Sequence, residues 1–327
     1  MKRLIKSALR KVATKAIESK SFKSRNGELV VLMYHGIVKE QPNIPDWCLV
    51  TAENFESQLI ELKRHFNILP LSEAIQKLRD GEIDGPTAAI TFDDGYKNNH
   101  DLAWPILERH EVPATIYLST NLIDSQSSIW TARLQSAFCQ TLVTVLNWRQ
   151  HTFNLSTIDG KVTAVSSIKK ILKTEHYQVI ADETALIEKA LFPNTKAPKR
   201  IIEDYQMLSS VMIKEMATSN LIEFGAHTLN HPILSRLSRE EQTMEISQSV
   251  DMVGELTGKP CTLFAYPNGS REDYSNITVE ILEQLSINCS FSTSSGINTK
   301  ATPKHEMVRY GVGNNADFLR ELYSMYK

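Results

Sequence analysis

The segment Ala88-Ala89-Ile90-Thr91-Phe92-Asp93-Asp94-Gly95 ends an apolar run with two adjacent carboxylates and a glycine. Ala88–Phe92 has the character of a buried strand, and Gly95 suits a turn directly after it. Adjacent acidic residues are most often found on a solvated turn. Here they follow Ile-Thr-Phe, so we expect them to be buried. The segment predicts a strand that carries two carboxylates at its carboxyl end.

A second strand-like run, Leu221–Ala226, leads into His227-Thr228-Leu229-Asn230-His231-Pro232. Because Pro232 disfavours helical geometry at His231, we expect both histidines in a loop at the strand's end. Two imidazoles and one carboxylate can hold a divalent metal, and the second carboxylate is then free to act as a base. The two segments together predict metal-assisted hydrolysis.

The chain alternates strand-like and helix-like segments on both sides of these motifs. The expected strands are Leu29–Tyr34, Ile68-Leu69, Ala88–Phe92, Ala114–Ser119, Leu221–Ala226, Thr262–Tyr266, Ser290–Thr293 and Met307–Val312. Thr51 and Ser72 are expected to cap helices, and Ser238–Glu241 has the pattern of a capping box. Seven or eight strands alternating with helices predict an α/β fold with a closed or nearly closed (β/α) barrel. In such a barrel, functional groups lie at the carboxyl ends of strands, where both motifs occur.

Two regions depart from this alternation. Residues 121–205 are predicted to form a helical insertion over the barrel mouth, with Asp159-Gly160 as the turn of a hairpin. Residues 1–25 contain nine Lys/Arg and one acidic residue, a charge of 9 − 1 = +8, and their apolar residues recur at helical spacing. We therefore divide the chain into a basic amphipathic helix, residues 1–26, and a barrel domain, residues 27–327.

Composition limits the classes of partner. The net charge of the whole chain is −2, so no nucleic-acid partner is expected. The amino-terminal segment lacks the apolar core of a signal peptide, which predicts a cytoplasmic protein. Its basic helix could make peripheral contact with an anionic inner-membrane surface; the alternative is a terminal helix that packs on the domain. The four cysteines form no Cys-x-x-Cys pair and suit free thiols.

The two motifs, Thr91–Gly95 with Tyr96 and His227–His231, resemble those of the polysaccharide deacetylases, the family four carbohydrate esterases. The resemblance covers roughly residues 29–120 and 205–312. It implies a distorted (β/α) barrel, a divalent metal, commonly Zn²⁺, and hydrolysis of N-acetyl groups on sugars. It also implies that Asp93 is the general base and that Asp94, His227 and His231 bind the metal.

The family's third motif, Arg-x-Pro-Tyr-Gly, corresponds to Ala265-Tyr266-Pro267-Asn268-Gly269. Alanine replaces the arginine and Asn268 replaces the tyrosine whose backbone N–H stabilises the oxyanion. The resemblance therefore implies substrate-binding roles for Tyr266, Asn268 and Gly269, with Asn268 as the N–H donor. Arg309 is the candidate to replace the missing arginine beside Asp93, the alternative being a surface salt bridge.

The family's general acid is a histidine in a Leu-x-His motif near the end of the domain, and no good match is present. His305 lies in a polar loop there. His35, at the end of the first strand, resembles the acid of the rearranged branch that acts on exopolysaccharides. His35 is therefore the preferred candidate, and the choice between the two histidines stays open. Tyr96, Trp47 and Trp130 could stack on sugar rings, although core packing also explains each of them.

The predicted function is removal of acetyl groups from an N-acetylhexosamine-containing glycan or lipid-linked sugar. One alternative is an amidase that acts on a non-acetyl or non-sugar amide. A second, from a different class, is an inactive glycan-binding relative that keeps the fold, since Ala265 and Asn268 depart from the third motif.

Overall fold

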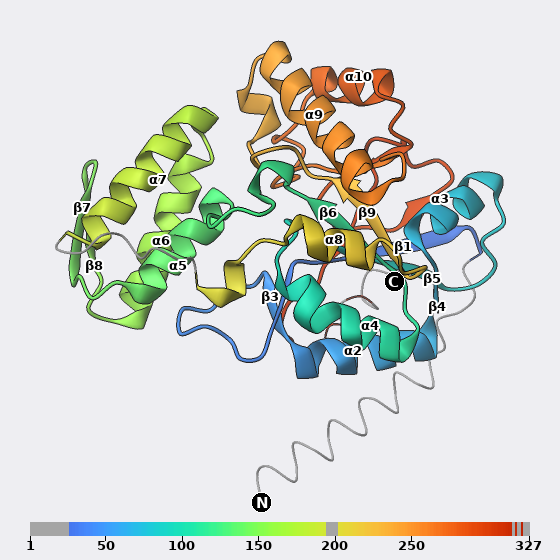
Figure 1. The fold of residues 1–327 in the computed structure, drawn as a ribbon, viewed down its shortest axis with the longest axis horizontal. Helices are drawn as coiled ribbons and strands as arrows, with labels where there is room; N and C mark the ends of the chain where they lie inside the picture. Colours follow the sequence, from blue (N-terminus) through green and yellow to red (C-terminus); the bar gives the residue numbers. More distant parts are fainter. Residues whose placement is uncertain (1–25, 194–201, 316–317, 319–321, 323–327) are drawn as a thin grey trace, which may run out of the picture.

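The computed structural model describes residues 26–193, 202–315, 318 and 322 (Figure 1). The predicted basic helix over residues 1–26 therefore lies, apart from Asn26, outside the described residues. Among the helices of the described part, none combines the length and apolar character needed to cross a bilayer.

The main sheet positions both motifs. Its continuous path is β11-β10-β9-β6-β5-β1-β12, with β4 paired to β5 and β13 paired to β1. The strands are β1 (Glu28–Tyr34), β4 (Asn67–Ile68), β5 (Thr87–Phe92), β6 (Ala114–Leu118), β9 (Ile222–Ala226), β10 (Leu263–Ala265), β11 (Cys289–Phe291), β12 (Asn298–Thr299) and β13 (Tyr310–Gly311). All pairs are parallel except β1 with β12. The carboxyl ends of these strands therefore meet at one rim of the sheet.

The sheet curls until an irregular segment, residues 304–312, bridges its two sides. On one side the Ser292 N–H donates to the Met307 carbonyl at 2.8 Å, which ties the segment to β11. On the other side β13 pairs with β1, and the Val312 N–H donates to the Met33 carbonyl at 2.9 Å. The predicted distorted barrel is confirmed. The strand expected over Met307–Val312 is shorter than predicted, because only Tyr310–Gly311 forms a strand and Met307 makes an isolated bridge to Phe291.

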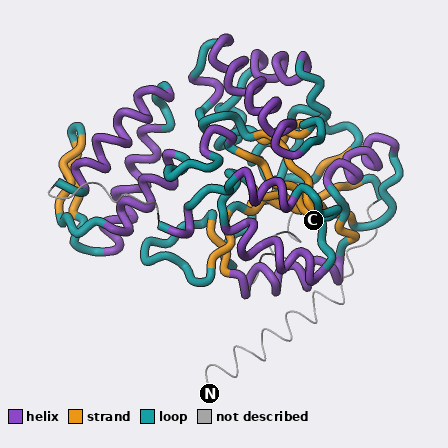
Figure 2. The backbone as a smooth tube through the Cα atoms, viewed as in Figure 1, coloured by secondary structure: helices purple, strands orange, loops and turns teal. Residues whose placement is uncertain are grey.

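Helices surround the curled sheet (Figures 1 and 2). They are α2 (Ala52–His65), α3 (Leu71–Asp80), α4 (Trp104–His110), α8 (Ser210–Met216), α9 (Arg239–Thr257) and α10 (Asn276–Gln284), with a π-helical turn η1 (Asn99–Ala103) and 3₁₀ turns η2 (Thr120–Leu122), η3 (Glu203–Tyr205) and η4 (Leu234–Arg236). The apolar face of α2 is buried at Phe55, Leu59 and Leu62. Every residue of β5 is buried, as expected for a strand covered on both faces.

The segment predicted as an insertion folds beside the barrel (Figure 1). It contains α5 (Trp130–Gln140), β7 (Val145–Trp148), β8 (His151–Asn154), α6 (Ile158–Leu172) and α7 (Tyr177–Leu191), packed around their own apolar cluster. The hairpin is β7–β8, so the prediction of a hairpin turn at Asp159-Gly160 is wrong. Those residues form the first turn of α6, because the Thr157 hydroxyl accepts the Gly160 N–H as an N-cap. A small sheet of β2 (Gly36–Val38) and β3 (Leu49–Thr51) follows β1.

Candidate functional site

The paired aspartates and the two histidines meet at the rim because β6 lies between β5 and β9. The Ser119 N–H, just after β6, donates to the Asp94 carbonyl at 3.4 Å, and the His227 N–H donates to the Leu118 carbonyl at 2.9 Å. Asp94 has φ 74° and His231 has φ 57°, in the left-handed region that non-glycine residues rarely adopt. Such strain is concentrated at functional sites, where the surrounding fold enforces it.

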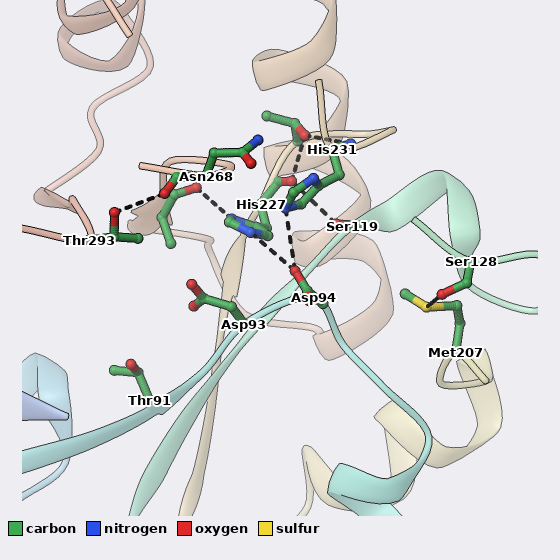
Figure 3. Close-up of polar contacts among 12 residues, drawn as sticks. Thr91, Asp93, Asp94, Ser119, Ser128, Met207, His227, His231, Asn268 and Thr293 are labelled. Carbon is green, nitrogen blue, oxygen red and sulfur yellow. Dashed lines mark hydrogen bonds and ion pairs between the residues drawn. The ribbon is translucent and has the colours of Figure 1, made fainter. Parts of the chain in front are cut away.

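Asp94, His227 and His231 form a buried cluster (Figure 3). The Asp94 Oδ1 lies 3.5 Å from the His227 Nε2 and 3.4 Å from the His231 Nε2. One ligand atom from each of the three residues lies within 4.8 Å of the other two. Two imidazole nitrogens and one carboxylate oxygen are a donor set that a divalent metal of the zinc type accepts, with room for further ligands. The residues present therefore fit the predicted metal site.

The hydrogen bonds behind the cluster prepare it for a cation. The His227 Nδ1 lies 2.7 Å from the carbonyl oxygen of Ala265, which places the proton on Nδ1 and leaves the Nε2 lone pair free. The loop that carries His231 is held by Glu245 of α9, whose Oε2 accepts the N–H groups of Leu229 and Asn230 at 2.9 and 3.0 Å. Glu245 was missed in the sequence. The signal that could have identified it is its position, as an acidic residue, on the buried face of α9.

Asp93 is held by a buried arginine from the segment that closes the barrel. The Arg309 Nη1 and Nη2 donate to the Asp93 Oδ1 and Oδ2 at 2.6 and 2.7 Å, and the Arg309 Nε donates to the Ser292 carbonyl at 3.1 Å. Arg309 is 0% exposed and Asp93 is 2% exposed. The alternative of a surface salt bridge for Arg309 is therefore wrong. A paired planar contact of this kind fixes both the position and the orientation of the carboxylate.

Electrostatics keep both aspartates ionised. Burial alone would raise the pKa of Asp93, but the Arg309 guanidinium and then the His227 imidazole outweigh burial and hold this pKa below its usual range. Burial likewise opposes ionisation of Asp94, and the imidazoles of His227 and His231 beside it still hold the pKa of Asp94 below its usual range. Burial lowers the pKa of His231 to about 4, so this imidazole is neutral near pH 7, as a metal ligand must be.

These residues line a cavity of about 890 Å³. His35, Asp93, Asp94, His227, His231 and Asn268 all contribute to its wall. Trp47 and Tyr96 also line the cavity. Trp47 is 59% exposed, whereas Tyr96 and Trp130 are buried in apolar clusters. Of the three aromatic candidates, only Trp47 presents a large free ring surface at the site.

Comparison with known proteins gives this arrangement a family. The sequence profile of the polysaccharide deacetylase family matches residues 80–290, a range that contains both motifs. The chain belongs to the polysaccharide deacetylase family. The predicted resemblance is confirmed.

Individual relatives share the fold or part of the sequence. The poly-beta-1,6-N-acetyl-D-glucosamine N-deacetylase of Staphylococcus epidermidis is 31% identical over 121 residues, which are 33% of this chain and 42% of that relative. The match thus spans less than half of the relative's length. The structure of the Streptococcus pyogenes deacetylase PplD, in complex with acetate, has a TM-score of 0.61 at 20% identity and covers 92% of this chain and 99% of its own. IcaB from Ammonifex degensii has a TM-score of 0.59 at 18% identity, covering 92% and 97%.

Within the polysaccharide deacetylase fold, the third motif is divided between site and core. Asn268 lines the cavity with φ 59°; its carbonyl accepts the Thr293 hydroxyl, and its buried Nδ2 has no partner among the described residues. Gly269 has φ 73° and completes this turn, where a Cβ would lie 2.8 Å from Thr293 Cγ2. Tyr266 is 0% exposed, stacks on Tyr274 and donates its hydroxyl to the His305 carbonyl. Tyr266 is not among the residues that line the cavity, so the prediction of a substrate contact is wrong for its side chain.

The two candidate acids occupy different places. His35 follows β1, lines the cavity with Asp93 and Asp94, and has an unpartnered buried Nδ1 among the described residues. Its ring meets that of Trp47 edge to face, with the centroids 5.1 Å apart. His305 is not among the cavity-lining residues; it is 3% exposed, and its Nδ1 lies 3.0 Å from the Ser290 hydroxyl. The position of His35 favours it as the proton donor.

Proposed function

We propose that this polysaccharide deacetylase is a metal-dependent hydrolase that removes N-acetyl groups from an N-acetylhexosamine-containing glycan. The observation that carries the proposal is the convergence on one cavity of a carboxylate–imidazole cluster and a second, separately held carboxylate. Asp94, His227 and His231 supply the cluster, and Asp93 is the carboxylate that Arg309 holds.

Asp94, His227 and His231 would hold the cation, with Zn²⁺ as the expected ion. When bound, a divalent cation of this kind polarises a carbonyl oxygen and lowers the pKa of water. Asp93 accepts the proton of the attacking water. Its ion pair with Arg309 makes Asp93 a weaker base than a free carboxylate. The same ion pair keeps Asp93 ionised and in one orientation.

His35 would protonate the departing sugar amine, since an amine leaves readily only after it gains a proton. Asn268 would donate its backbone N–H to the oxygen of the acetyl group as negative charge develops there. Among the described residues that N–H has no hydrogen-bond acceptor, so it is available for this contact. Trp47 offers its exposed ring to the apolar face of a pyranose.

A relative and the composition of the chain support a proposal for the substrate class. The Staphylococcus relative is named for poly-β-1,6-N-acetylglucosamine, and we propose a glycan of the same N-acetylglucosamine type. A lipid-linked or nascent glycan at the cytoplasmic face of the inner membrane would also suit the charge of +8 (9 − 1) carried by residues 1–25. Vesicles with and without anionic lipid would test that location.

The experiment is acetate release by the purified, Zn²⁺-loaded protein from N-acetylhexosamine oligomers, lipid-linked N-acetylglucosamine and formylated analogues. We expect acetate from at least one N-acetylated glycan, and loss of that activity in Asp93→Asn. Asp84→Asn is the matched control. Asp84 is exposed and precedes β5, whereas Asp93 follows that strand, so this variant should keep the activity. No acetate from any substrate, or equal rates for Asp93→Asn and the unchanged protein, would overturn the proposal.

A further inference from the structure

One wall of the active-site cavity is a face of α6. Its contributing residues are Val162, Val165, Ser166, Lys169, Lys170 and the C-cap residue Lys173. Successive members are three residues or one residue apart in the sequence, the spacing of side chains on a single face of a helix. The opposite face of α6 packs into the apolar cluster of the insertion through Ala164, Ile168 and Leu172. The helix is therefore fixed, and its carboxyl-terminal part presents three ammonium groups to the cavity.

The three lysines have no carboxylate partner in the part of the chain that the structure describes. The Lys169 Nζ donates to the Gln135 Oε1 at 3.0 Å, a neutral acceptor that also lines the cavity. Lys170 and Lys173 are exposed, and neither makes an ion pair with a described residue. Burial lowers the pKa of Lys169, the charge of Asp46 opposes this shift, and the charge of Lys173 adds to it. Like charges in consecutive turns of a helix repel one another.

Four of the five acidic residues that line the cavity are engaged by groups other than these lysines. Asp46 attracts Lys169 at a distance, but its carboxylate accepts the Tyr205 hydroxyl at 2.9 Å and the Cys48 N–H at 3.1 Å. Asp273 accepts the N–H and the hydroxyl of Ser270.

Asp93 is paired with Arg309 and Asp94 belongs to the metal cluster, so Glu272 is the remaining acidic residue of the lining. Arg236 adds a further positive charge to the cavity lining.

We propose that Lys169, Lys170 and Lys173 form a subsite for anionic groups, phosphate or carboxylate, on the glycan that is deacetylated. This inference rests on the proposed function and narrows its substrate class. Lysine ammonium groups bind phosphate and carboxylate as point charges. A neutral poly-N-acetylglucosamine chain becomes cationic as its acetyl groups are removed, and the lysines would repel that product. A chain that carries anions would be attracted before and after the reaction.

The test compares β-1,6-linked N-acetylglucosamine pentamers that are neutral, carry one phosphate, or carry one carboxymethyl group, with the anion placed on each sugar in turn. The proteins are the unchanged chain, Lys170→Gln/Lys173→Gln, Lys170→Arg/Lys173→Arg, and Lys189→Gln as a control. Lys189 is an exposed lysine of α7 outside the cavity lining. Acetate release gives kcat/KM, and calorimetric titration gives the Kd of each pentamer, with inorganic phosphate as the free anion.

We expect the unchanged protein to prefer at least one anionic pentamer by about tenfold or more, as paired charges in a cavity allow. The preference should fall severalfold in the glutamine variant and at 0.5 M NaCl, and persist in the arginine variant and in Lys189→Gln. The phosphate and carboxymethyl arms show which anion the subsite takes.

Equal kcat/KM for neutral and anionic pentamers, or an undiminished preference in the glutamine variant, would overturn the inference while leaving the deacetylase proposal intact. If no pentamer is deacetylated, the deacetylase proposal fails for this substrate class, and the Kd values still decide the inference. Tighter binding of an anionic pentamer that disappears in the glutamine variant would support the subsite. Equal Kd values would reject it.

Discussion

At the scale of single residues, the site depends on a buried ion pair contributed by two distant parts of the chain. Arg309 reaches Asp93 from the segment that closes the barrel, and occupies the functional place of an arginine that the third motif lacks at Ala265. The guanidinium also lies over the rings of Tyr117 and Phe291, 5.6 and 6.0 Å from their centroids. Its removal would leave the Asp93 charge buried and uncompensated.

Arg309→Met is therefore expected to destabilise the fold by about 3–5 kcal/mol, the cost of breaking a buried ion pair on one side. Urea unfolding measures this change. In the double variant Arg309→Met/Asp93→Asn the stranded charge is gone, so part of the stability should return. A loss of less than about 1 kcal/mol in Arg309→Met would contradict the account, because surface pairs have that magnitude.

A second prediction at this scale separates the two candidate acids. His35→Gln should lower kcat by about 100- to 10,000-fold, the usual contribution of a general acid, and should leave KM and the bound metal little changed. His305→Gln is the matched control, because that imidazole bonds to Ser290 away from the cavity. Its kcat per folded molecule should stay within about twofold of the unchanged protein. Equal losses in both variants would show that His35 has no special role in proton transfer.

At the scale of elements, the helix caps and strands that depend on neighbouring residues could be predicted from short stretches of sequence. The capping box of α9 is present as expected, with the Ser238 hydroxyl and the Glu241 side chain bonded reciprocally, and Gly258 ends the helix in the left-handed conformation. The apolar runs at β1, β5, β6 and β9 became strands. Their polar ends placed the aspartates and histidines at one rim, so most of the site could be predicted from two short motifs.

The wrong or missing predictions concern residues whose contacts come from parts of the chain that are distant in sequence. Ser72 does not cap α3, which begins at Leu71 after Pro70, because the Ser72 N–H and hydroxyl bond instead to Glu223 of β9. Tyr266 has the sequence position of a substrate contact, but packing against Tyr274 buries it. Glu245, which was not predicted, acts on the histidine loop only through the fold. Arg309 was expected beside Asp93, and barrel closure does bring the two side chains together. No sequence window contains both members of these pairs.

Alanine substitutions at two glycines, one in β9 and one in α9, should change the stability of the fold in opposite directions. A Cβ on Gly225 of β9 would lie 2.5 Å from the Tyr117 Cε1 and 2.9 Å from the Leu263 carbonyl oxygen. Gly225→Ala should therefore cost roughly 1–3 kcal/mol through overpacking. A Cβ on Gly254 of α9 would meet only the Lys259 carbonyl oxygen at 3.6 Å, so Gly254→Ala should stabilise by about 0.5–1 kcal/mol. Thermal unfolding of both variants checks the pair, and a stabilised Gly225→Ala would contradict the packing of β9 on Tyr117.

At the scale of the whole molecule, the barrel and the insertion together make the site. The rim supplies the proposed metal ligands and the proposed base, and α5 and α6 supply the facing wall of the cavity. The insertion has its own apolar cluster, yet it is tied to the barrel side by Gln135, whose side-chain amide donates to the Ile44 carbonyl at 3.3 Å. A cation bound at the rim would therefore be linked to the stability of the folded chain, since Asp94, His227 and His231 come together only in that fold.

This linkage gives a prediction that needs no substrate. Zn²⁺ at a free concentration of about 100 times its Kd should stabilise the folded protein by about 2.7 kcal/mol and raise Tm by several degrees. Chelation should reverse the rise. Asp94→Asn removes one ligand and the charge opposite both imidazoles, so its Tm should respond little to the same Zn²⁺, whereas Asp84→Asn should respond fully. An equal rise in Asp94→Asn would mean that the cation binds elsewhere on the chain, and the three residues would then be a hydrogen-bonded cluster without a metal role.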